Sequence, residues 1–426
     1  MNNFTFYAPT MFAFGQGEAS RVGALVRQFG GSKVLLVAGG GSVKKNGTYD
    51  AVAVSLKEAG LSWCELWGVQ ANPRSGKVYE GIDLARTEGA DFLLAIGGVI
   101  DTAKAIGMGI PYDGDFWDFF TGKAKIEHTL PVGTVLTISA AGSEGSDSCV
   151  ITQEDGNLKW GCPKTDLIRP KFSVLDPTYT YSLPDYQLAC GAVDMLAHLC
   201  ERYFTNTPDV ALTDRLCEAV MKTIVDAAPK ALADHSDYAS HADLMWAGML
   251  AHNNSCGIGR DQDWASHQIE HELSAFYDCA HGAGLAVVMP AWMEYVCGHD
   301  VMRFARFAVN VFGCEMDFAH PERTAQAGIR RLRDFFRTLG QLRRTRESLR
   351  AGALRYLLAR GGALAIEREC GGERTVTALN AGDAPADLTL AWDSPTAQDA
   401  VTGQRFLVID GKAHLTLPPL DGVILV

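Results

Sequence analysis

Ser32-Lys-Val-Leu-Leu-Val-Ala38-Gly39-Gly-Gly-Ser42 is the stretch that indicates the fold of the first half of the chain. Its apolar, β-branched run predicts a buried parallel strand, and the glycines predict a tight turn into a helix. Helix patterns at 49–59 and 77–89 alternate with strand patterns at 61–66 and 91–96. This alternation predicts an α/β fold, with helices on both faces of a parallel sheet.

The glycine turns after two of these strands, Gly39–Ser42 and Gly97-Gly98, are candidate phosphate-binding loops. Backbone N–H groups and a helix N-terminus attract anions there. Neither turn matches Gly-x-Gly-x-x-Gly, and an ordinary tight turn is the more common meaning of such glycines. Ser42, Lys44 and Lys45 stand where an acidic residue would bind a ribose 2′-hydroxyl. A hydroxyl and two cations favour a 2′-phosphate, so we expect NADP(H) rather than NAD(H).

Two further strand patterns, at 130–137 and 172–176, extend the predicted sheet. Between them lies the small, polar loop Ile138-Ser-Ala-Ala-Gly-Ser143-Glu-Gly-Ser-Asp147. Its hydroxyls and amides suit a dinucleotide, although an ordinary Ser/Gly surface loop has the same composition. Lys159 follows in Gly156-Asn-Leu-Lys159-Trp.

From residue 184 to about 339 the pattern is helical almost throughout, with clear periodicity at 214–227, 243–253 and 315–338. Asp194-Met-Leu-Ala-His198 and His267-Gln-Ile-Glu-His271 each place two side chains on one helix face. A carboxylate and several imidazoles from separate helices suit Fe(II) or Zn(II). We predict that Asp194, His198, His267 and His281 hold one divalent metal.

The simpler alternative is that Asp194 and His198 form an ordinary hydrogen-bonded pair, which is the more frequent meaning of Asp-x-x-x-His. Their neighbours from Val193 to Leu199 are otherwise apolar, so both groups need a partner if they are buried. His281 is followed by Gly282-Ala-Gly284, small residues that let backbone and ligand approach closely. Both features favour the metal site.

The composition limits the possible classes of protein. A chain of 426 residues predicts two or three domains, and its 47% hydrophobic content is that of a globular protein. The net charge of −12 argues against nucleic acid and acidic membrane surfaces as partners. No apolar run reaches the roughly 18 residues of a membrane span. No secretory signal is seen, and eleven cysteines without CxxC spacing suggest reduced thiols in a cytoplasm.

Residues 1 to about 340 resemble the iron-containing (group III) alcohol dehydrogenases, close to the NADPH-dependent butanol dehydrogenase and aldehyde reductase branch. The stretches that carry the resemblance are Gly39-Gly-Gly-Ser42-Val-Lys-Lys, Val135-Leu-Thr137, Ala141-Gly-Ser143-Glu, Gly191-Ala-Val-Asp194-Met-Leu-Ala-His198, Asp263-Trp-Ala-Ser-His267-Gln-Ile-Glu-His271-Glu-Leu-Ser-Ala and His281-Gly-Ala-Gly-Leu-Ala-Val-Val-Met-Pro290.

The resemblance implies a Rossmann-like dinucleotide-binding domain at 1–182 and an all-α metal-binding domain at 183–340. It implies the same four metal ligands, a small primary alcohol or aldehyde such as butanol or butanal as substrate, and a homodimer. His271 would lie near the nicotinamide and relay a proton; its alternative is a helix-surface or supporting histidine. The expected cofactor-binding residues are Gly40, Gly41, Ser42, Lys45, Gly97, Gly98, Asp101, Thr137, Ser143 and Lys159.

One departure from the family lies in the second glycine turn. The family carries Gly-Gly-Gly-Ser-x-x-Asp-x-x-Lys, whereas this chain has Gly97-Gly-Val-Ile-Asp101-Thr-Ala-Lys104. The two missing residues remove up to about 7 Å of reach. We expect either that Val99 and Ile100 are drawn into the turn or that the helix unwinds at its start. Both would place bulky apolar groups near the pyrophosphate and weaken cofactor binding.

The other departure is the tail, 341–426. Residues 343–354 form an arginine-rich, helix-like segment, and strand alternation with Gly-containing turns follows. This part resembles the C-terminal β-sandwich of amylase-type glycosidases such as neopullulanase, through Thr375-Val-Thr-Ala-Leu-Asn-Ala-Gly-Asp383, Asp399-Ala-Val-Thr-Gly403 and Leu415-Thr-Leu-Pro-Pro-Leu420. No paired glycosidase carboxylates can be carried over. A natural fusion and a mis-assembled sequence are both open.

Three functional hypotheses follow. The leading one is an NADP(H)-dependent alcohol dehydrogenase or aldehyde reductase. A second is a glycerol dehydrogenase-like member of the same superfamily. The third is a non-catalytic relic or a carbohydrate-associated fusion, which the shortened turn at Gly98 favours.

Overall fold

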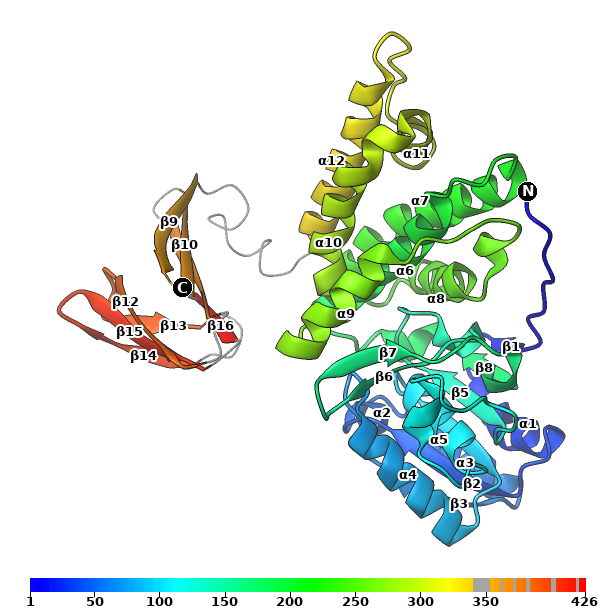
Figure 1. Cartoon of the computed structure of the whole chain (residues 1–426). Helices are drawn as coiled ribbons and strands as arrows, with labels where there is room; N and C mark the ends of the chain where they lie inside the picture. Colours follow the sequence, from blue (N-terminus) through cyan, green and yellow to red (C-terminus); the bar gives the residue numbers. More distant parts are fainter. Residues whose placement is uncertain (340–352, 361–362, 371–372, 381–383, 400–403, 419–420) are drawn as a thin grey trace. The chain divides into compact units, whose positions relative to one another are not determined.

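The computed structural model describes residues 1–339, 353–360, 363–370, 373–380, 384–399, 404–418 and 421–426 (Figure 1). These residues divide into two compact units, Met1–Phe336 and Arg337–Val426. The first unit contains a parallel sheet followed by a bundle of helices, and the second contains antiparallel strands. No helix among the described residues is both long enough and apolar enough to cross a membrane.

A six-stranded parallel sheet forms the nucleotide-binding half of the first unit. In spatial order its strands are β1 (Met11–Phe14), β8 (Phe172–Leu175), β5 (Val132–Leu136), β4 (Phe92–Ile96), β2 (Lys33–Ala38) and β3 (Ser62–Leu66). Every residue of β4, β5 and β8 is buried, which explains why their sequences are apolar on both faces. The predicted α/β fold is therefore confirmed, with β1 as an additional edge strand.

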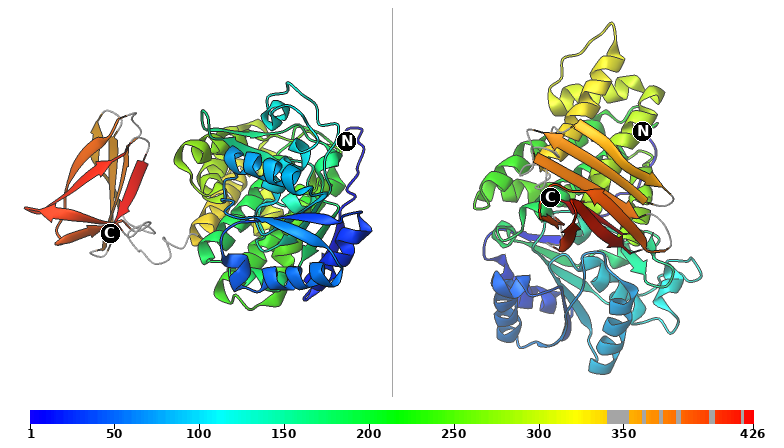
Figure 2. Two further views of the ribbon diagram at one scale, coloured as in Figure 1. Left: turned by 90° about the horizontal axis from the view of Figure 1, so that it is seen from below. Right: turned by 90° about the vertical axis from the view of Figure 1, so that its left-hand side faces the viewer.

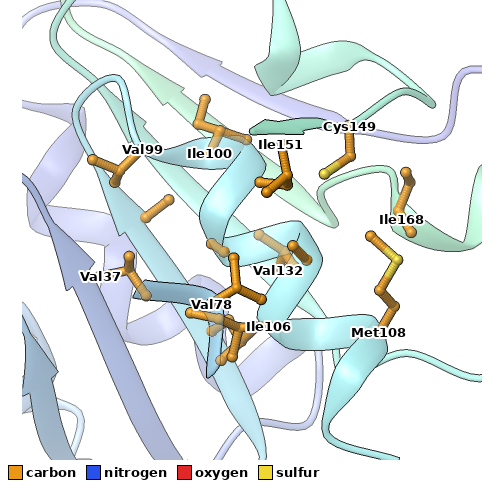
Figure 3. Packing of buried hydrophobic residues seen from close by; sticks show 14 of the residues in the cluster. Val37, Val78, Val99, Ile100, Ile106, Met108, Val132, Cys149, Ile151 and Ile168 are labelled. Atoms are coloured by element: carbon orange, nitrogen blue, oxygen red, sulfur yellow. The ribbon is translucent and has the colours of Figure 1, made fainter. Parts of the chain in front are cut away.

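Helices cover both faces of this sheet, as the left view of Figure 2 shows. They are α1 (Val22–Gln28), α2 (Ser42–Lys45), α3 (Thr48–Glu58), α4 (Ser75–Glu88) and α5 (Ile100–Gly109). The core against α4 and α5 includes Ile82, together with Val78 and Ile106, which are labelled in Figure 3. A second core on the opposite face includes Val22 and Val52, from α1 and α3. The sheet is thus held rigidly between two apolar layers.

The shortened glycine turn leaves the start of α5 intact. Val99 immediately precedes the helix, and Ile100 is its first residue. Both side chains are buried, at 5% and 4% exposure, in the core drawn in Figure 3. We expected either that Val99 and Ile100 are drawn into the turn or that the helix unwinds. Val99 does lie in the turn, whereas Ile100 begins the helix, which does not unwind. The bulky side chains are absorbed by the core, and Gly97, Gly98 and Val99 alone connect β4 to α5.

The helical half begins after β8. Its helices are α6 (Asp185–Tyr203), α7 (Ala211–Ala233), α8 (Tyr238–His252), α9 (Ala265–Tyr277), α10 (His281–Val296), α11 (Val301–Phe312) and α12 (Pro321–Leu339). The helix predicted from 315 begins only at Pro321. Asp317 accepts the backbone N–H groups of Ala319 and His320, which holds a turn there. Proline suits the first helical position because its missing N–H is not needed.

A two-stranded hairpin, β6 (Val150–Gln153) and β7 (Leu158–Gly161), connects the two halves of the first unit. β7 contacts α9, and in Figure 1 the hairpin lies between the sheet and the helices. It was not predicted, although it carries Lys159. Short 3-10 helices complete the unit: η1 (Glu18–Arg21), η2 (Phe116–Phe119), η3 (Ser143–Gly145), η4 (Asp166–Ile168), η5 (Pro177–Thr180), η6 (Ser255–Gly257) and η7 (Cys297–His299).

The second unit is a small β-sandwich. Its strands are β9 (Ala353–Arg360), β10 (Ala363–Cys370), β11 (Glu373–Asn380), β12 (Ala386–Ala391), β13 (Thr396–Gln398), β14 (Arg405–Ile409), β15 (Lys412–Leu417) and β16 (Asp421–Leu425). They form two four-stranded sheets, ordered β16-β11-β10-β9 and β12-β15-β14-β13. Val376 from one sheet and Leu415 from the other belong to one buried core. The predicted sandwich is confirmed.

The helix-like segment predicted at 343–354 is wrong at its end, because Ala353 and Leu354 begin β9 and pair with β10. Alternation and cross-strand pairing outweigh the local arginine-rich pattern at these two positions. Residues 343–352 lie outside the described residues.

Candidate metal centre and cofactor-binding edge

Asp194 and His198 lie one turn apart on α6 and face the same side of the helix. Asp194 Oδ1 is 3.4 Å from His198 Nδ1, and each side chain is almost fully buried. The rest of this helix segment is apolar and packed, so the two polar groups are enclosed by the fold. Their spacing places a carboxylate and an imidazole together, as the sequence predicted.

Two further histidines approach the same carboxylate from other helices. His267 is in the first turn of α9 and His281 is the first residue of α10. The distances from Asp194 Oδ1 are 3.8 Å to His267 Nε2 and 3.7 Å to His281 Nε2. The rings of His198 and His267 are 4.5 Å apart between centroids. The fold thus brings together all four predicted metal ligands.

Three atoms at this point are buried without a hydrogen-bond partner among the described residues: Asp194 Oδ1, His198 Nδ1 and His267 Nε2. Leaving such groups unsatisfied is costly, so their convergence calls for a ligand. Candidate ligand atoms of Asp194, His267 and His281 all lie within 4.8 Å of one another. One carboxylate oxygen with imidazole nitrogens is a donor set that fits Fe(II) or Zn(II).

The protonation of two of the histidines, His198 and His281, also suits a metal. Burial, reinforced by the neighbouring histidines, lowers the pKa of His198 well below its usual value. Burial likewise lowers the pKa of His281, to about 3. For His267, burial lowers the pKa, but the neighbouring carboxylates of Asp194 and Glu201 outweigh burial and raise it. Neutral imidazoles present the lone pair that a cation requires.

Two buried glutamates contact the Nδ1 atoms of two of these histidines, on the side of the ring away from Asp194. Neither glutamate was selected from the sequence. Glu201 Oε1 is 3.0 Å from His267 Nδ1 and also accepts the His267 backbone N–H. Glu270 contacts His281 Nδ1. Each glutamate follows a predicted ligand by three residues, His198 and His267 respectively, so helical spacing was the available indication.

His271 lies one turn after His267 on α9, beside the metal cluster. Its ring centroid is 5.5 Å from that of His281. A His271 nitrogen lies within 4.8 Å of ligand atoms of Glu270 and His281. Burial lowers the pKa of His271, and the nearby His281 and Lys159 lower it further. His271 therefore adjoins the cluster as a neutral imidazole.

The predicted glycine turns meet at one edge of the sheet. The chain passes from β2 outward to β3 and then returns to β4 on the other side of β2. Such a reversal of strand order leaves a crevice at the carboxyl ends of the strands, where dinucleotides bind. Gly97 has a φ of +97°, and a Cβ there would lie 3.2 Å from Thr137 Oγ1. Gly97 and Thr137 are thus neighbours at this edge.

The residues after β2 are open to solvent. A Cβ at Gly40 or Gly41 would meet nothing within 4 Å. Ser42 and Lys45, the first and last residues of the short helix α2, are exposed. The Lys44 ammonium lies over the Trp67 ring, 3.9 Å from its centroid. Of the two predicted cations, Lys44 is therefore the one held against aromatic rings, those of Trp67 and Tyr49.

Asp101 and Ser143 are joined to each other by a hydrogen bond. Asp101 Oδ2 also accepts the backbone N–H of Val150, at 2.9 Å. Lys104, which the sequence analysis did not select, is fully buried and donates to the carbonyl oxygens of Ser143, Ser146 and Ser148 at 2.7, 3.0 and 2.9 Å. Burial lowers the pKa of Lys104. Residues of α5 therefore hold the polar loop in place.

Lys159 lies against Glu270, beside the metal cluster. Its Nζ donates to Asn72 Oδ1 at 3.2 Å and is 3.8 Å from Glu270 Oε2. The side chain is 6% exposed. Burial lowers the pKa of Lys159, and Glu270 and Asp194 oppose this change.

Both halves of the first unit match families of known proteins. Residues 9–177 match iron-containing alcohol dehydrogenase, and residues 188–350 match the C-terminal domain of the Fe-containing alcohol dehydrogenase family. The chain is 43% identical to the probable NADH-dependent butanol dehydrogenase 2 of Bacillus subtilis, over 80% of this chain and 87% of that one. It is 35% identical to the NADPH-dependent aldehyde reductase YqhD of Escherichia coli, over 80% and 87%.

Solved structures agree with these matches. The crystal structure of NADH-dependent butanol dehydrogenase A from Thermotoga maritima shares 40% identity with a TM-score of 0.77, covering 80% of this chain and 85% of that one. The crystal structure of E. coli YqhD shares 34% identity with a TM-score of 0.75, covering 80% and 86%.

Proposed function

Because the chain belongs to the iron-containing alcohol dehydrogenase family, we propose that it is a metal-dependent oxidoreductase that transfers a hydride between NADP(H) and a small primary alcohol or aldehyde. Convergence of the buried, unpartnered atoms Asp194 Oδ1, His198 Nδ1 and His267 Nε2 carries this proposal. Butanol and butanal are the substrates proposed, since relatives at 41–43% identity are named butanol dehydrogenases.

Asp194, His198, His267 and His281 would hold the metal, which we propose to be Fe(II) or Zn(II). When bound, the ion supplies a Lewis acid that polarises the oxygen of the alcohol or aldehyde. The four side chains would fix its position, and three of them, Asp194, His198 and His267, are buried, which limits the access of water. Hydride transfer itself is the chemistry of the nicotinamide.

We assign cofactor binding to the carboxyl edge of the sheet. Backbone N–H groups of Gly40, Gly41, Gly97 and Gly98 would bind the pyrophosphate, aided by the positive end of α5. Thr137 and the polar loop around Ser143 would line the remaining length of the cofactor, with Asp101 holding the loop through Ser143.

NADP(H) is proposed over NAD(H) because of the charge beside α2. The exposed Ser42 and Lys45 offer a hydroxyl and a cation to a 2′-phosphate. E. coli YqhD is named an NADPH-dependent enzyme, whereas the butanol dehydrogenases of Bacillus and Clostridium are named NADH-dependent. Dissociation constants for NADPH and NADH, measured by titrating the cofactor fluorescence, decide between them.

His271 is assigned the proton exchange. Its imidazole adjoins His281 and is only partly covered, so it lies where it can exchange a proton between an alcohol hydroxyl and solvent. The metal ligands themselves are directed toward Asp194 and are not available for this step.

The proposal is tested by following NADPH oxidation with butanal on the full chain. Activity should disappear after the metal is removed by a chelator and return when Fe(II) or Zn(II) is added. Protein that binds one equivalent of metal and NADPH yet turns over no short aldehyde and no short alcohol would overturn the proposed function.

A further inference from the structure

Glu270 is a completely buried carboxylate that faces His281. It lies on α9, has 0% side-chain exposure and contacts His281 Nδ1 through Oε2. Ser274, one turn later on the same helix, donates its hydroxyl to Glu270 Oε1. A metal-binding histidine usually donates its other ring N–H to such a carboxyl group, so this contact assigns the proton of His281 to Nδ1. The lone pair on Nε2 then faces Asp194 Oδ1, 3.7 Å away.

The glycines after His281 explain how the carboxylate reaches this position. A Cβ on Gly284 would lie 2.7 Å from both Cγ and Oε1 of Glu270. A Cβ on Gly282 would lie 2.1 Å from the carbonyl oxygen of Cys190 in α6. Gly284 therefore leaves the space that Glu270 occupies, while Gly282 lets α10 approach α6. Together the two glycines allow Glu270 to reach His281.

The charge on Glu270 is balanced from the nucleotide-binding half. Lys159 Nζ on β7 is 3.8 Å from Glu270 Oε2, and these two side chains are 6% and 0% exposed. Lys159 also donates to Asn72 Oδ1. Asn72 Nδ2 donates in turn to Asp278 Oδ1 at 2.9 Å and to the Cys279 carbonyl at 3.2 Å. A buried anion needs such a partner, because an uncompensated charge is strongly destabilising.

We propose that Glu270 is a positioning residue of the metal centre, which fixes the ring of His281 for coordination, and that Lys159 holds Glu270 in place from the nucleotide-binding half. The inference rests on the proposed function, because it requires that the cluster binds a metal. Glu201 has the same relation to His267, but its partners lie within the helical half. His281 is therefore linked through Glu270 to Lys159 on the β6–β7 hairpin, whereas His267 is not linked to the hairpin through Glu201.

Metal affinity is the direct test. Full-length protein is stripped of metal, and its Zn(II) dissociation constant is measured by competition with a chromophoric chelator. Glu270→Gln should weaken binding about tenfold, since losing a carboxylate behind a ligating histidine typically costs 10–100-fold. Lys159→Met should weaken it by a smaller factor. Glu272→Gln, an exposed neighbour on α9, is the control and should change nothing.

A spectroscopic measurement separates positioning from mere stability. Co(II) bound to the wild type gives a visible spectrum that reports its ligand geometry, and Glu270→Gln should alter that spectrum. Wild-type Zn(II) affinity together with an unchanged Co(II) spectrum in Glu270→Gln overturns the inference and leaves the proposed function standing. If the wild type itself binds no Zn(II), the proposed function is overturned as well.

Gly284→Ala gives an independent test should Glu270→Gln fail to fold. It keeps the carboxylate but fills its space, so it should also weaken Zn(II) binding severalfold. Gly298→Ala is the matched control, because a Cβ there meets nothing within 4 Å. Equal Zn(II) affinity in the two glycine variants would count against the role of Glu270.

Discussion

The metal centre is formed by side chains, whereas the cofactor-binding edge is formed largely by backbone groups. At the metal centre, buried side chains from α6, α9 and α10 converge on Asp194 Oδ1, and carboxylates stand behind two of them. At the cofactor edge, the proposed contacts come largely from the backbone of glycine turns, one of them short, beside the exposed Ser42 and Lys45. The first site is fixed before its ligand arrives, whereas the second is more open and depends on loop length.

Replacing Asp194 by Asn should have the largest effect and shows whether the two sites are separable. The carboxylate that the three histidines face loses its charge, so we expect metal binding to fall sharply and activity to fall by about a thousandfold or more, equivalent to ~4 kcal/mol. NADPH affinity should stay within about twofold of wild type. Metal content and fluorescence titration measure the two. Asp226→Asn, on the exposed side of α7, is the control. An equal loss of metal binding and NADPH binding would show that the two sites are not separable.

A buried carboxyl on the cofactor side gives the next largest effect. Burial raises the pKa of Glu144, beside Ser143, to about 7, and Lys104 only partly opposes this. The folded protein therefore holds this proton more tightly than the unfolded chain. Stability from this group is greatest below the unfolded pKa and declines as pH rises toward 7. The decline in the free energy of unfolding should be about 3 kcal/mol.

Chemical denaturation of the full chain between acidic and neutral pH measures this decline. Glu144→Gln cannot ionise, so it should lose this part of the pH dependence and be more stable than wild type near neutrality. The same pH dependence in both proteins would show that the Glu144 carboxyl does not titrate as its burial implies.

Restoring the length of the second glycine turn tests the cofactor edge alone. Inserting Gly-Ser between Gly98 and Val99 should tighten NADPH binding by about tenfold, because added backbone N–H groups donate to a charged pyrophosphate. Zn(II) affinity should not change. The same insertion between Asp155 and Gly156, in the exposed turn of the β6–β7 hairpin, controls for added length. An unchanged NADPH dissociation constant would mean that the turn is long enough already.

Lys45→Ala should have the smallest effect. It removes an exposed cation next to the proposed 2′-phosphate, so NADPH affinity should fall about fivefold, or ~1 kcal/mol, while NADH affinity is unchanged. The loss should diminish at high salt. Lys57→Ala, exposed on α3, is the matched control. Equal losses for NADPH and NADH would assign the selectivity to other residues.

Local periodicity explains which parts of the fold could be predicted. β2, β4 and β5 have apolar runs followed by turns, and α6 to α10 keep a helical repeat, so their positions follow from neighbouring residues. β1 and the β6–β7 hairpin were not predicted. Each of these strands is defined by its pairing: β1 pairs with its neighbour β8, and β6 pairs with β7. A short run of residues does not by itself specify such a partner.

The candidate site shows the same limit. Asp194 and His198 were predicted because a separation of four residues fixes a shared helix face. Glu270, Lys159 and Lys104 acquire their roles from contacts across elements, and a sequence carries no direct record of such distances. Lys159 remains a predicted cofactor-binding residue, and its contacts with Glu270 and Asn72, which arise because β7 packs against α9, could not be read from the sequence.

The position of β8 has a consequence for synthesis of the chain. β8 lies between β5 and β1, so Phe172 pairs with Met11 on one side and with Gly133 on the other. β1, the first strand of this sheet along the chain, therefore cannot pair until β8, the last one, has been synthesised. Until then, β1 is unattached and β5 presents an open edge to other chains. Assembly of this sheet is set by a late, long-range closure, and a nascent chain halted before Phe172 would be prone to aggregate.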